Sequence, residues 1–249
     1  VGGFDKVFEP NRNFRNEGLD RSHNPEFTML EIYEAYGDLR SMLALVQDLI
    51  VQVAQKVFGT LKVGAGEAEV DLTPPWPQLP YRDAIRQKAG DDWFELPLEK
   101  MRERAQGMGL SIDPAWSAVE VTHEIYEKLI EKTFKNPVFV TRFPAQLIPL
   151  AKRCEDDPSL VDVFELVIRG WEVAPAYSEL NDPIEQRKRF EEQAQGHAQK
   201  LDEEFLTAME HGMPPAGGMG IGIDRLAMVL TGMDAIRDVV LFPQLKNKD

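Results

Sequence analysis

The chain has 249 residues, 43% of them hydrophobic, which is typical of a soluble globular protein with one large core or two unequal ones. Its formal net charge of −14 opposes sequence-independent attraction to nucleic-acid phosphates, and its single cysteine, Cys154, excludes an internal disulfide. No apolar run approaches the roughly 18 residues needed to cross a bilayer, so we expect a cytoplasmic protein with no membrane partner.

Two alternating segments open the chain. From Lys6 to Glu17, a period of two places four polar residues on one face of a strand: Asn11, Asn13, Arg15 and Glu17. After turn-forming residues from Gly18 to Pro25, the alternation resumes with Phe27, Met29, Glu31 and Tyr33 on one face. We expect an antiparallel strand pair. Because the first residue is Val1 and a strand follows at once, we also expect residues 1–249 to begin inside a longer domain.

A helix of about five turns is predicted next, and it should cover one face of the sheet. Its apolar positions are Leu39, Met42, Leu43, Val46, Leu49, Ile50, Val53 and Val57. A short strand signal and prolines follow between Val70 and Pro80, where helix interior is excluded. Residues 81–133 are charged and helical in period, with a break at Gly107–Gly109, and we predict an inserted helical subdomain there.

The second half of the chain mixes strands and helices. Strand signals span Val138–Thr141 and Val161–Arg169, and an irregular stretch is predicted from Gly170 to Leu180. Asp182 before Pro183 predicts a helix running toward Gly196. A second helix is expected over Leu201–Met209, and the glycine-rich segment Gly217–Ile223 should be a strand that leads directly into a helix opening at Asp224 and Arg225.

The strand pair carries groups that suit a charged ligand. Arg15, Glu17, Glu31 and Tyr33 would point the same way, and Arg15 is the natural partner for a phosphate or carboxylate. A solvated sheet face explains the alternation equally well. The position of Glu31 and Tyr33 within an otherwise apolar run favours a pocket, because burying such groups is costly unless something charged is bound.

Three further acidic residues, Glu165, Glu172 and Glu179, lie in and next to the predicted irregular stretch. Carboxylates that converge with phosphates usually hold Mg²⁺, whereas two carboxylates and a phenol around a dry pocket would select an ammonium group. The spacing of His23, His123, His197 and His211 fits no zinc site. Surface charge remains the stronger alternative on spacing alone, since the chain has 42 acidic residues.

The glycine run Gly217–Gly222 does not match a dinucleotide-binding site, because its spacing is GxGxG and no acidic residue follows in a βαβ unit. Glycines let a backbone approach a flat ligand closely, and Arg225 at the following helix start can lie over an aromatic base. A tightly packed joint between strand and helix is the alternative.

Three segments, Phe14–Gly18, His23–Thr28 and Gly220–Arg225, together resemble motifs 2 and 3 of the class II aminoacyl-tRNA synthetases. With Met29–Tyr33 and Tyr177–Asp182, the pattern is similar to that of the lysyl enzymes. The resemblance implies an α+β fold, an antiparallel sheet flanked by helices with a helical insertion. It also implies ATP-dependent activation of L-lysine to lysyl-adenylate, transfer to tRNA(Lys), and a homodimer in the full-length protein.

The resemblance also implies roles for individual residues. Arg15 and Arg225 would be catalytic, with Arg15 on the α-phosphate and on the lysine carboxylate. ATP would contact Arg15, Glu17, His23, Asn24, Phe27, Glu165, Gly222 and Arg225. Lysine would contact Arg15, Glu31, Tyr33, Tyr177 and Glu179. Mg²⁺ on the phosphates would be held by Glu165 and Glu172.

The chain departs from the family pattern at Ala174–Ala176, where Pro175 replaces an asparagine that helps to hold the substrate. Motif 1 and the anticodon-binding OB-fold are expected before Val1. Two alternatives stay open: a paralogue that attaches lysine or β-lysine to a protein such as elongation factor P, and a non-catalytic ATP- or amino-acid-binding module. The second predicts loss of Arg15, Glu165 or Arg225, all of which are present.

Overall fold

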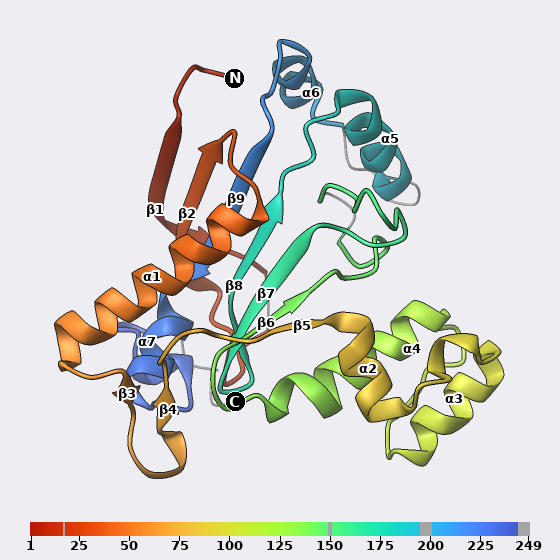
Figure 1. The fold of residues 1–249 in the computed structure, drawn as a ribbon, viewed down its shortest axis with the longest axis horizontal. Coiled ribbons are helices and arrows are strands. Elements are labelled where there is room, and N and C mark those ends of the chain that lie inside the picture. Colours follow the sequence, from red (N-terminus) through yellow and green to blue (C-terminus); the bar gives the residue numbers. More distant parts are fainter. Residues whose placement is uncertain (17, 149–150, 195–200, 244–249) are drawn as a thin grey trace, which may run out of the picture.

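The computed structural model describes residues 1–16, 18–148, 151–194 and 201–243, and Glu17 therefore lies outside the described residues. In this part of the chain, seven strands form one sheet with the order β1-β2-β9-β8-β7-β6-β5 (Figure 1). All neighbours in the sheet are antiparallel except β5 and β6, which are parallel. Helices flank the sheet, so the predicted α+β class is confirmed. The strands are β1 (Lys6–Phe14), β2 (Glu26–Ala35), β5 (Gln78–Pro80), β6 (Val138–Thr141), β7 (Val163–Ile168), β8 (Trp171–Ser178) and β9 (Ala216–Gly222).

The opening strand pair forms as predicted, with Asn13 opposite Phe27 and Val7 opposite Tyr33. The predicted strand end at Glu17 is wrong, because β1 ends at Phe14. One further hydrogen bond follows the strand, from the backbone N–H of Arg15 to the Pro25 carbonyl at 3.0 Å. β1 is the edge of the described sheet, and its residues are exposed apart from the half-buried Asn13. The polar face of β1 is therefore solvated along most of its length.

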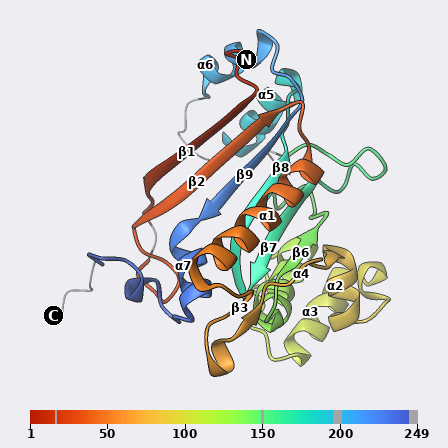
Figure 2. The same cartoon turned by 60° about the vertical axis from the view of Figure 1, so that its left-hand side comes forward.

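Helix α1 (Leu39–Phe58) crosses one face of the sheet (Figure 2). Asp38 caps it by accepting hydrogen bonds from the backbone N–H groups of Arg40 and Ser41. Its fully buried residues, Met42, Val46, Ile50 and Ala54, pack in a core with the β2 residues Leu30 and Ile32. The buried stripe ends at Ala54, so Val57, predicted in the apolar face, is 64% exposed.

The expectation that no apolar segment is long enough to cross a bilayer needs correction at α1. By length and composition, this helix passes that test among the described residues. Part of its apolar composition faces the sheet, where Met42, Val46, Ile50 and Ala54 are buried and Leu39, Leu43, Leu49 and Val53 are partly buried against the same core.

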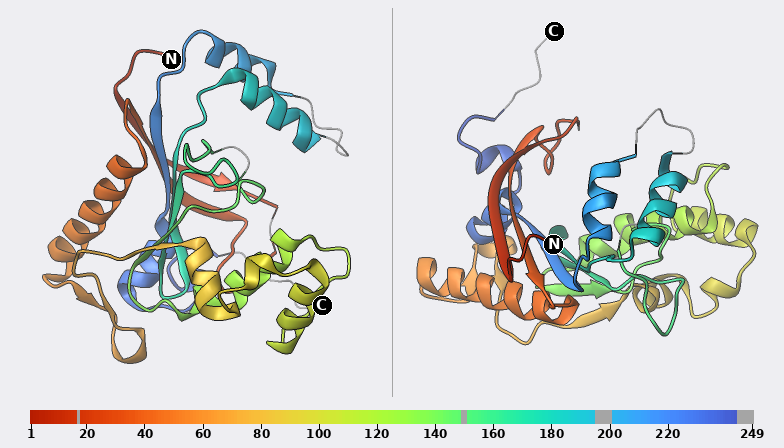
Figure 3. Two further views of the ribbon diagram at one scale, coloured as in Figure 1. Left: turned by 45° about the vertical axis from the view of Figure 1, so that its right-hand side comes forward. Right: turned by 90° about the horizontal axis from the view of Figure 1, so that it is seen from above.

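The segment predicted as a helical subdomain is helical. It contains α2 (Tyr81–Ala89), α3 (Leu98–Gly107), α4 (Ala118–Ile125) and the π-helix η3 (Tyr126–Ile130), with 3₁₀ turns η2 (Trp93–Glu95) and η4 (Glu131–Thr133). The helices gather beside β5 and β6, away from α1 (Figure 3). They share a second core with the sheet, since Tyr81, Trp93 and Tyr126 pack with Val140 and Val163. The segment is thus joined to the sheet through a common apolar cluster.

The predicted irregular stretch from Gly170 to Leu180 is wrong, because Trp171–Ser178 forms β8 in the middle of the sheet. Two features hide this strand from a reading of periodicity. The register against Leu166 and Val167 of β7 skips Val173, which interrupts the alternation within β8, and Pro175 is a residue that rarely occupies a central strand. Pro175 lies opposite Glu165 of β7, and the pairing with β9 begins one residue later, at Ala176.

The remaining helices follow the predicted order: α5 (Pro183–Ala194), α6 (Glu203–Glu210) and α7 (Ile223–Thr231). The short strand β4 (Val70–Asp71) lies at the predicted strand signal and pairs with β3 (Lys62–Val63), which was not predicted. The 3₁₀ turns η1 (Gly66–Ala68) and η5 (Ile236–Asp238) were not predicted either. Asp182 caps α5 as predicted, and the expected extension toward Gly196 lies outside the described residues. Because Asp202 caps α6, that helix begins two residues later than Leu201. β9 leads directly into α7, as predicted.

Candidate active site

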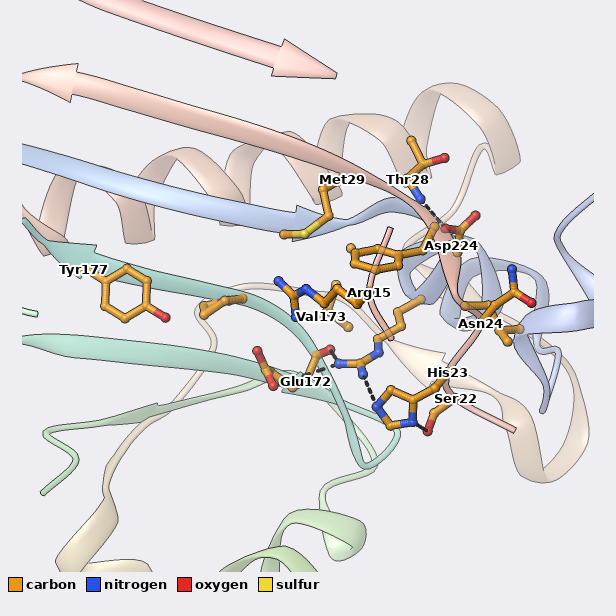
Figure 4. Close-up of a pocket in the computed structure, with 15 residues that line it drawn as sticks. Arg15, Ser22, His23, Asn24, Thr28, Met29, Glu172, Val173, Tyr177 and Asp224 are labelled. Atoms are coloured by element: carbon orange, nitrogen blue, oxygen red, sulfur yellow. Dashed lines mark hydrogen bonds and ion pairs between the residues drawn. The ribbon is translucent and has the colours of Figure 1, made fainter. Parts of the chain in front are cut away.

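A cavity of about 350 Å³ opens at the end of the sheet where β2, β8 and β9 meet the start of α7 and the loop from Gly18 to Pro25 (Figure 4). Eight of the residues predicted from the sequence line it: Arg15, His23, Asn24, Phe27, Glu172, Tyr177, Gly222 and Arg225. Pro175, noted above as the departure from the family pattern, also lines the cavity, together with residues that were not predicted as site residues: Ser22, Thr28, Met29, Val173, Asp224 and Ile236. Of these, Met29 shares the strand face of Phe27, and Asp224 precedes Arg225, so both could have been found.

Arg15 and Phe27 lie together in this cavity. The Arg15 guanidinium carbon is 5.2 Å from the centre of the Phe27 ring. A guanidinium over an aromatic face is held by cation–π attraction, and its planar N–H groups match the oxygens of a phosphate or a carboxylate. The pair therefore presents a cationic fork next to an apolar ring, an arrangement that suits a phosphate beside a flat base.

Arg225 is held from two sides. One of its terminal nitrogens, Nη1, donates to the backbone carbonyl of Glu172 at 2.8 Å, and Nη2 lies 3.3 Å from His23 Nε2 (Figure 4). The Glu172 carboxylate is 3.9 Å away. Next to it, Asp224 accepts a hydrogen bond from the backbone N–H of Thr28 at 2.7 Å, which joins the start of α7 to β2. The helix start is thus tied to both neighbouring strands.

A second group of predicted residues, Glu31, Tyr33 and Glu179, lies farther along the same face of the sheet. The register places Gly218 of β9 between Tyr33 of β2 and Tyr177 of β8. A Cβ atom on Gly218 would overlap a carboxylate oxygen of Glu179 and come within 2.7 Å of the Tyr33 ring. The glycines of β9 therefore leave room for side chains from the strands on either side.

These side chains form a strongly acidic site. The Tyr33 hydroxyl donates to Glu31 Oε2 at 3.3 Å. Burial, followed by the charge of Glu31, raises the pKa of Glu179 to about 7. Burial and the charges of Glu31 and Glu179 likewise raise the pKa of Tyr33 to about 12. An acidic group whose ionisation is opposed by burial and by a like charge is stabilised by a bound cation, so this site suits an ammonium group.

The two carboxylates predicted to hold a metal come from neighbouring strands. Glu165 of β7 accepts a long hydrogen bond of 3.4 Å from the Tyr126 hydroxyl, and Glu172 of β8 lines the cavity. Burial and the charges of Glu172 and Glu131 raise the pKa of Glu165 well above its ordinary range. Among the described residues, no three metal-ligating side chains form a complete site. Two mutually repelling carboxylates still fit Mg²⁺, which usually takes one or two from the protein and the rest from phosphates and water.

Comparisons with known proteins match all or nearly all of the chain. The family model for class II tRNA synthetases (D, K and N) matches residues 1–246. A lysine–tRNA ligase of Pelotomaculum thermopropionicum is 46% identical over 258 aligned positions, which cover 100% of this chain and 51% of that protein. Those of Moorella thermoacetica and Bacillus subtilis are 47% and 45% identical, again over 100% of this chain, and 52% and 51% of them are covered. The chain thus spans about half the length of these relatives.

Proposed function

Since the chain belongs to the class II tRNA synthetases of the D, K and N group, we propose that it carries the ATP-dependent lysine-activating site of a lysine–tRNA ligase. The observation that carries the proposal is the acidic site of Glu31, Tyr33 and Glu179, which opens on the same sheet face as the cavity with Arg15. The acidic site suits an ammonium group and the cavity with Arg15 suits a phosphate, and the activation of lysine by ATP needs both.

In the cavity, Phe27 and Arg225 would hold the adenine ring between them, with His23, Asn24 and Gly222 around the nucleotide; Glu17, also predicted there, lies outside the described residues. Arg15 would contact the α-phosphate and the lysine carboxylate. That carboxylate attacks the α-phosphorus, the bond to the bridging oxygen breaks, and pyrophosphate leaves. The guanidinium lowers the repulsion between the two anions and stabilises the charge that develops at phosphorus.

Lysine would bind with its side-chain ammonium against Glu31, Glu179 and the Tyr33 hydroxyl, beside Tyr177. A cation lowers the pKa of a neighbouring carboxyl, so a bound ammonium would keep Glu179 ionised although its pKa is about 7 in the empty site. An uncharged analogue would leave two carboxylates unpaired in this site, which is the basis for rejecting it. Pro175 borders the cavity without a side-chain donor, so it provides no polar contact there.

Mg²⁺ would be held by Glu165 and Glu172. When bound, it would neutralise charge on the ATP phosphates. Glu165 is oriented for this by the Tyr126 hydroxyl, and Glu172 by its place beside Arg225.

The acceptor of the activated lysine would be tRNA(Lys), and the protein would act as a cytoplasmic homodimer. The similarity to lysine–tRNA ligases supports these proposals. Residues 81–133 would be a helical insertion within the catalytic domain, which their shared core with β6 and β7 supports.

The test is ATP–pyrophosphate exchange by the full-length protein with L-lysine, with β-lysine and with no amino acid. We expect exchange stimulated by L-lysine and abolished by Arg15→Ala and Glu179→Gln, with Asp48→Asn on the exposed side of α1 as the charge-matched control. Stimulation by β-lysine alone would favour the protein-modifying paralogue. Absence of exchange with either amino acid would refute an activating enzyme.

A further inference from the structure

The loop from Gly18 to Pro25 contains a carboxylate that the proposed function does not use. Asp20 Oδ1 accepts hydrogen bonds from the backbone N–H groups of Ser22 and His23, both at 2.7 Å. The same carboxylate lies 2.9 Å and 3.0 Å from His23 Nδ1 through its two oxygens. Although partial burial raises the pKa of Asp20, hydrogen bonds from His23 and Ser22 outweigh that effect and lower it to about 2. At neutral pH this carboxylate only accepts hydrogen bonds.

The opposite nitrogen of the same ring faces a group that only donates. His23 Nε2 lies 3.3 Å from Arg225 Nη2, and a guanidinium has no acceptor atom. Two independent contacts thus assign one protonation state to His23: Nδ1 carries the proton and Nε2 carries the lone pair. The Ser22 hydroxyl, 3.0 Å from Nδ1, is compatible with this state because it can accept.

From this geometry we infer that Asp20 is a positioning residue, which fixes the Nδ1–H tautomer of His23 so that Nε2 can hold the Arg225 guanidinium at the cavity wall. Arg225 is then fastened between the His23 ring on one side and the Glu172 carbonyl on the other. The chain of contacts connects a loop residue to a helix start about 200 positions later in the sequence. The link to ATP binding rests on the proposed function, whereas the tautomer and the restraint on Arg225 do not.

A purely structural role for Asp20 is the competing explanation, since its Oδ1 also organises the loop backbone. Asp20→Asn separates the two roles. The side-chain carbonyl of asparagine can still accept from the Ser22 and His23 backbone, but its other atom is an NH₂ donor. That donor favours a lone pair on His23 Nδ1, which moves the ring proton to Nε2 and places it against the N–H of Arg225.

The test combines NMR with ATP binding in the full-length protein. Residues 1–249 contain four histidines, and His23→Gln identifies the His23 ring resonances. Long-range ¹H–¹⁵N correlation should show His23 as the Nδ1–H tautomer in the wild type and as Nε2–H in Asp20→Asn, with a changed Arg225 Nε–H resonance. Calorimetry should show ATP binding weakened at least about tenfold by Asp20→Asn, the lower end of the range expected for one hydrogen bond to a charged group. Asp48→Asn, the matched control, should change none of these.

A double-mutant cycle excludes loop disruption as the cause. In the His23→Gln background the glutamine carbonyl can accept from Arg225 whatever Asp20 does, so Asp20→Asn should no longer weaken ATP binding. The same loss in both backgrounds would overturn the inference, as would an Nε2–H or doubly protonated His23 in the wild type at neutral pH. A switched tautomer with unchanged ATP affinity and an unchanged Arg225 resonance would also overturn it. If the wild type bound no ATP, the proposed function would fail, while the tautomer and the Arg225 resonance would still decide the role of Asp20.

Discussion

Gly218→Ala is expected to damage the amino-acid half of the site while sparing the nucleotide half. The added Cβ would overlap a Glu179 carboxylate oxygen and lie 2.7 Å and 2.8 Å from two Tyr33 ring carbons. Both neighbours are side chains, and Tyr33 is 43% exposed, so they can move aside while the backbone stays in place. We expect an overpacking loss of about 1–3 kcal/mol in unfolding free energy.

The displaced groups are those proposed to bind the lysine ammonium. Losing a hydrogen bond to a charged group costs about 1.5–3 kcal/mol, which corresponds to a rise of about tenfold to a hundredfold in KM for lysine. KM for ATP should change less than about threefold, because Phe27 and Arg225 do not contact Gly218. The assays are ATP–pyrophosphate exchange with each substrate varied in turn, and urea unfolding.

Gly107→Ala is the control, since an added Cβ at this helical glycine meets no atom within 4 Å. It should keep both KM values and leave stability equal or slightly higher. Equal changes of both KM values in Gly218→Ala, or an unchanged KM for lysine, would refute the assignment of this glycine to the space between Tyr33 and Glu179.

Three further outcomes are expected. Because the pKa of Glu179 is raised to about 7, lysine affinity measured by calorimetry should rise as pH increases toward 7 and then level off, with proton release on binding; Glu179→Gln should remove this dependence. Ile50→Ala should lower the unfolding free energy by about 2–5 kcal/mol in urea, whereas Val57→Ala should cost less than about 0.5 kcal/mol. Asp224→Ala should lower the unfolding free energy in urea by about 1–3 kcal/mol, because it leaves the Thr28 N–H without its acceptor. Asp224→Asn keeps a side-chain oxygen and should restore most of that free energy.

Much of the fold was predictable because its signals are local. A period of two identified β1, β2 and β6, a helical period identified α1, and a cap residue marked the start of α5. β8 was not predicted because its local sequence lacks the alternation of a strand, and the segment is held in the sheet by contacts with distant strands. Pro175 and a register shift against β7 break the alternation, yet strands on both sides hold this segment in the sheet.

The candidate site also contains residues that could be predicted from the sequence and residues that could not. His23, Phe27 and Arg225 could be grouped by resemblance to a known family, and the cavity does bring them together. The approach of Glu179 to Glu31 could not be read from periodicity, because the two residues meet only through the strand order β2-β9-β8. Asp20 was not predicted because a carboxylate in a polar turn is indistinguishable from ordinary surface charge in the sequence. Its contacts with His23 appear only in the structure.

The glycines of β9 have a consequence for engineering the amino-acid specificity of the protein. Gly218 and Gly220 have no side chains, and the groups proposed to bind lysine occupy the space above them from β2 and from the end of β8. Replacing Glu31 alone would remove one cause of the raised pKa of Glu179, so the remaining carboxyl would ionise more readily and still attract a cation. A search for variants with new substrates should therefore randomise positions 31 and 179 together, as one library, and leave the glycines untouched.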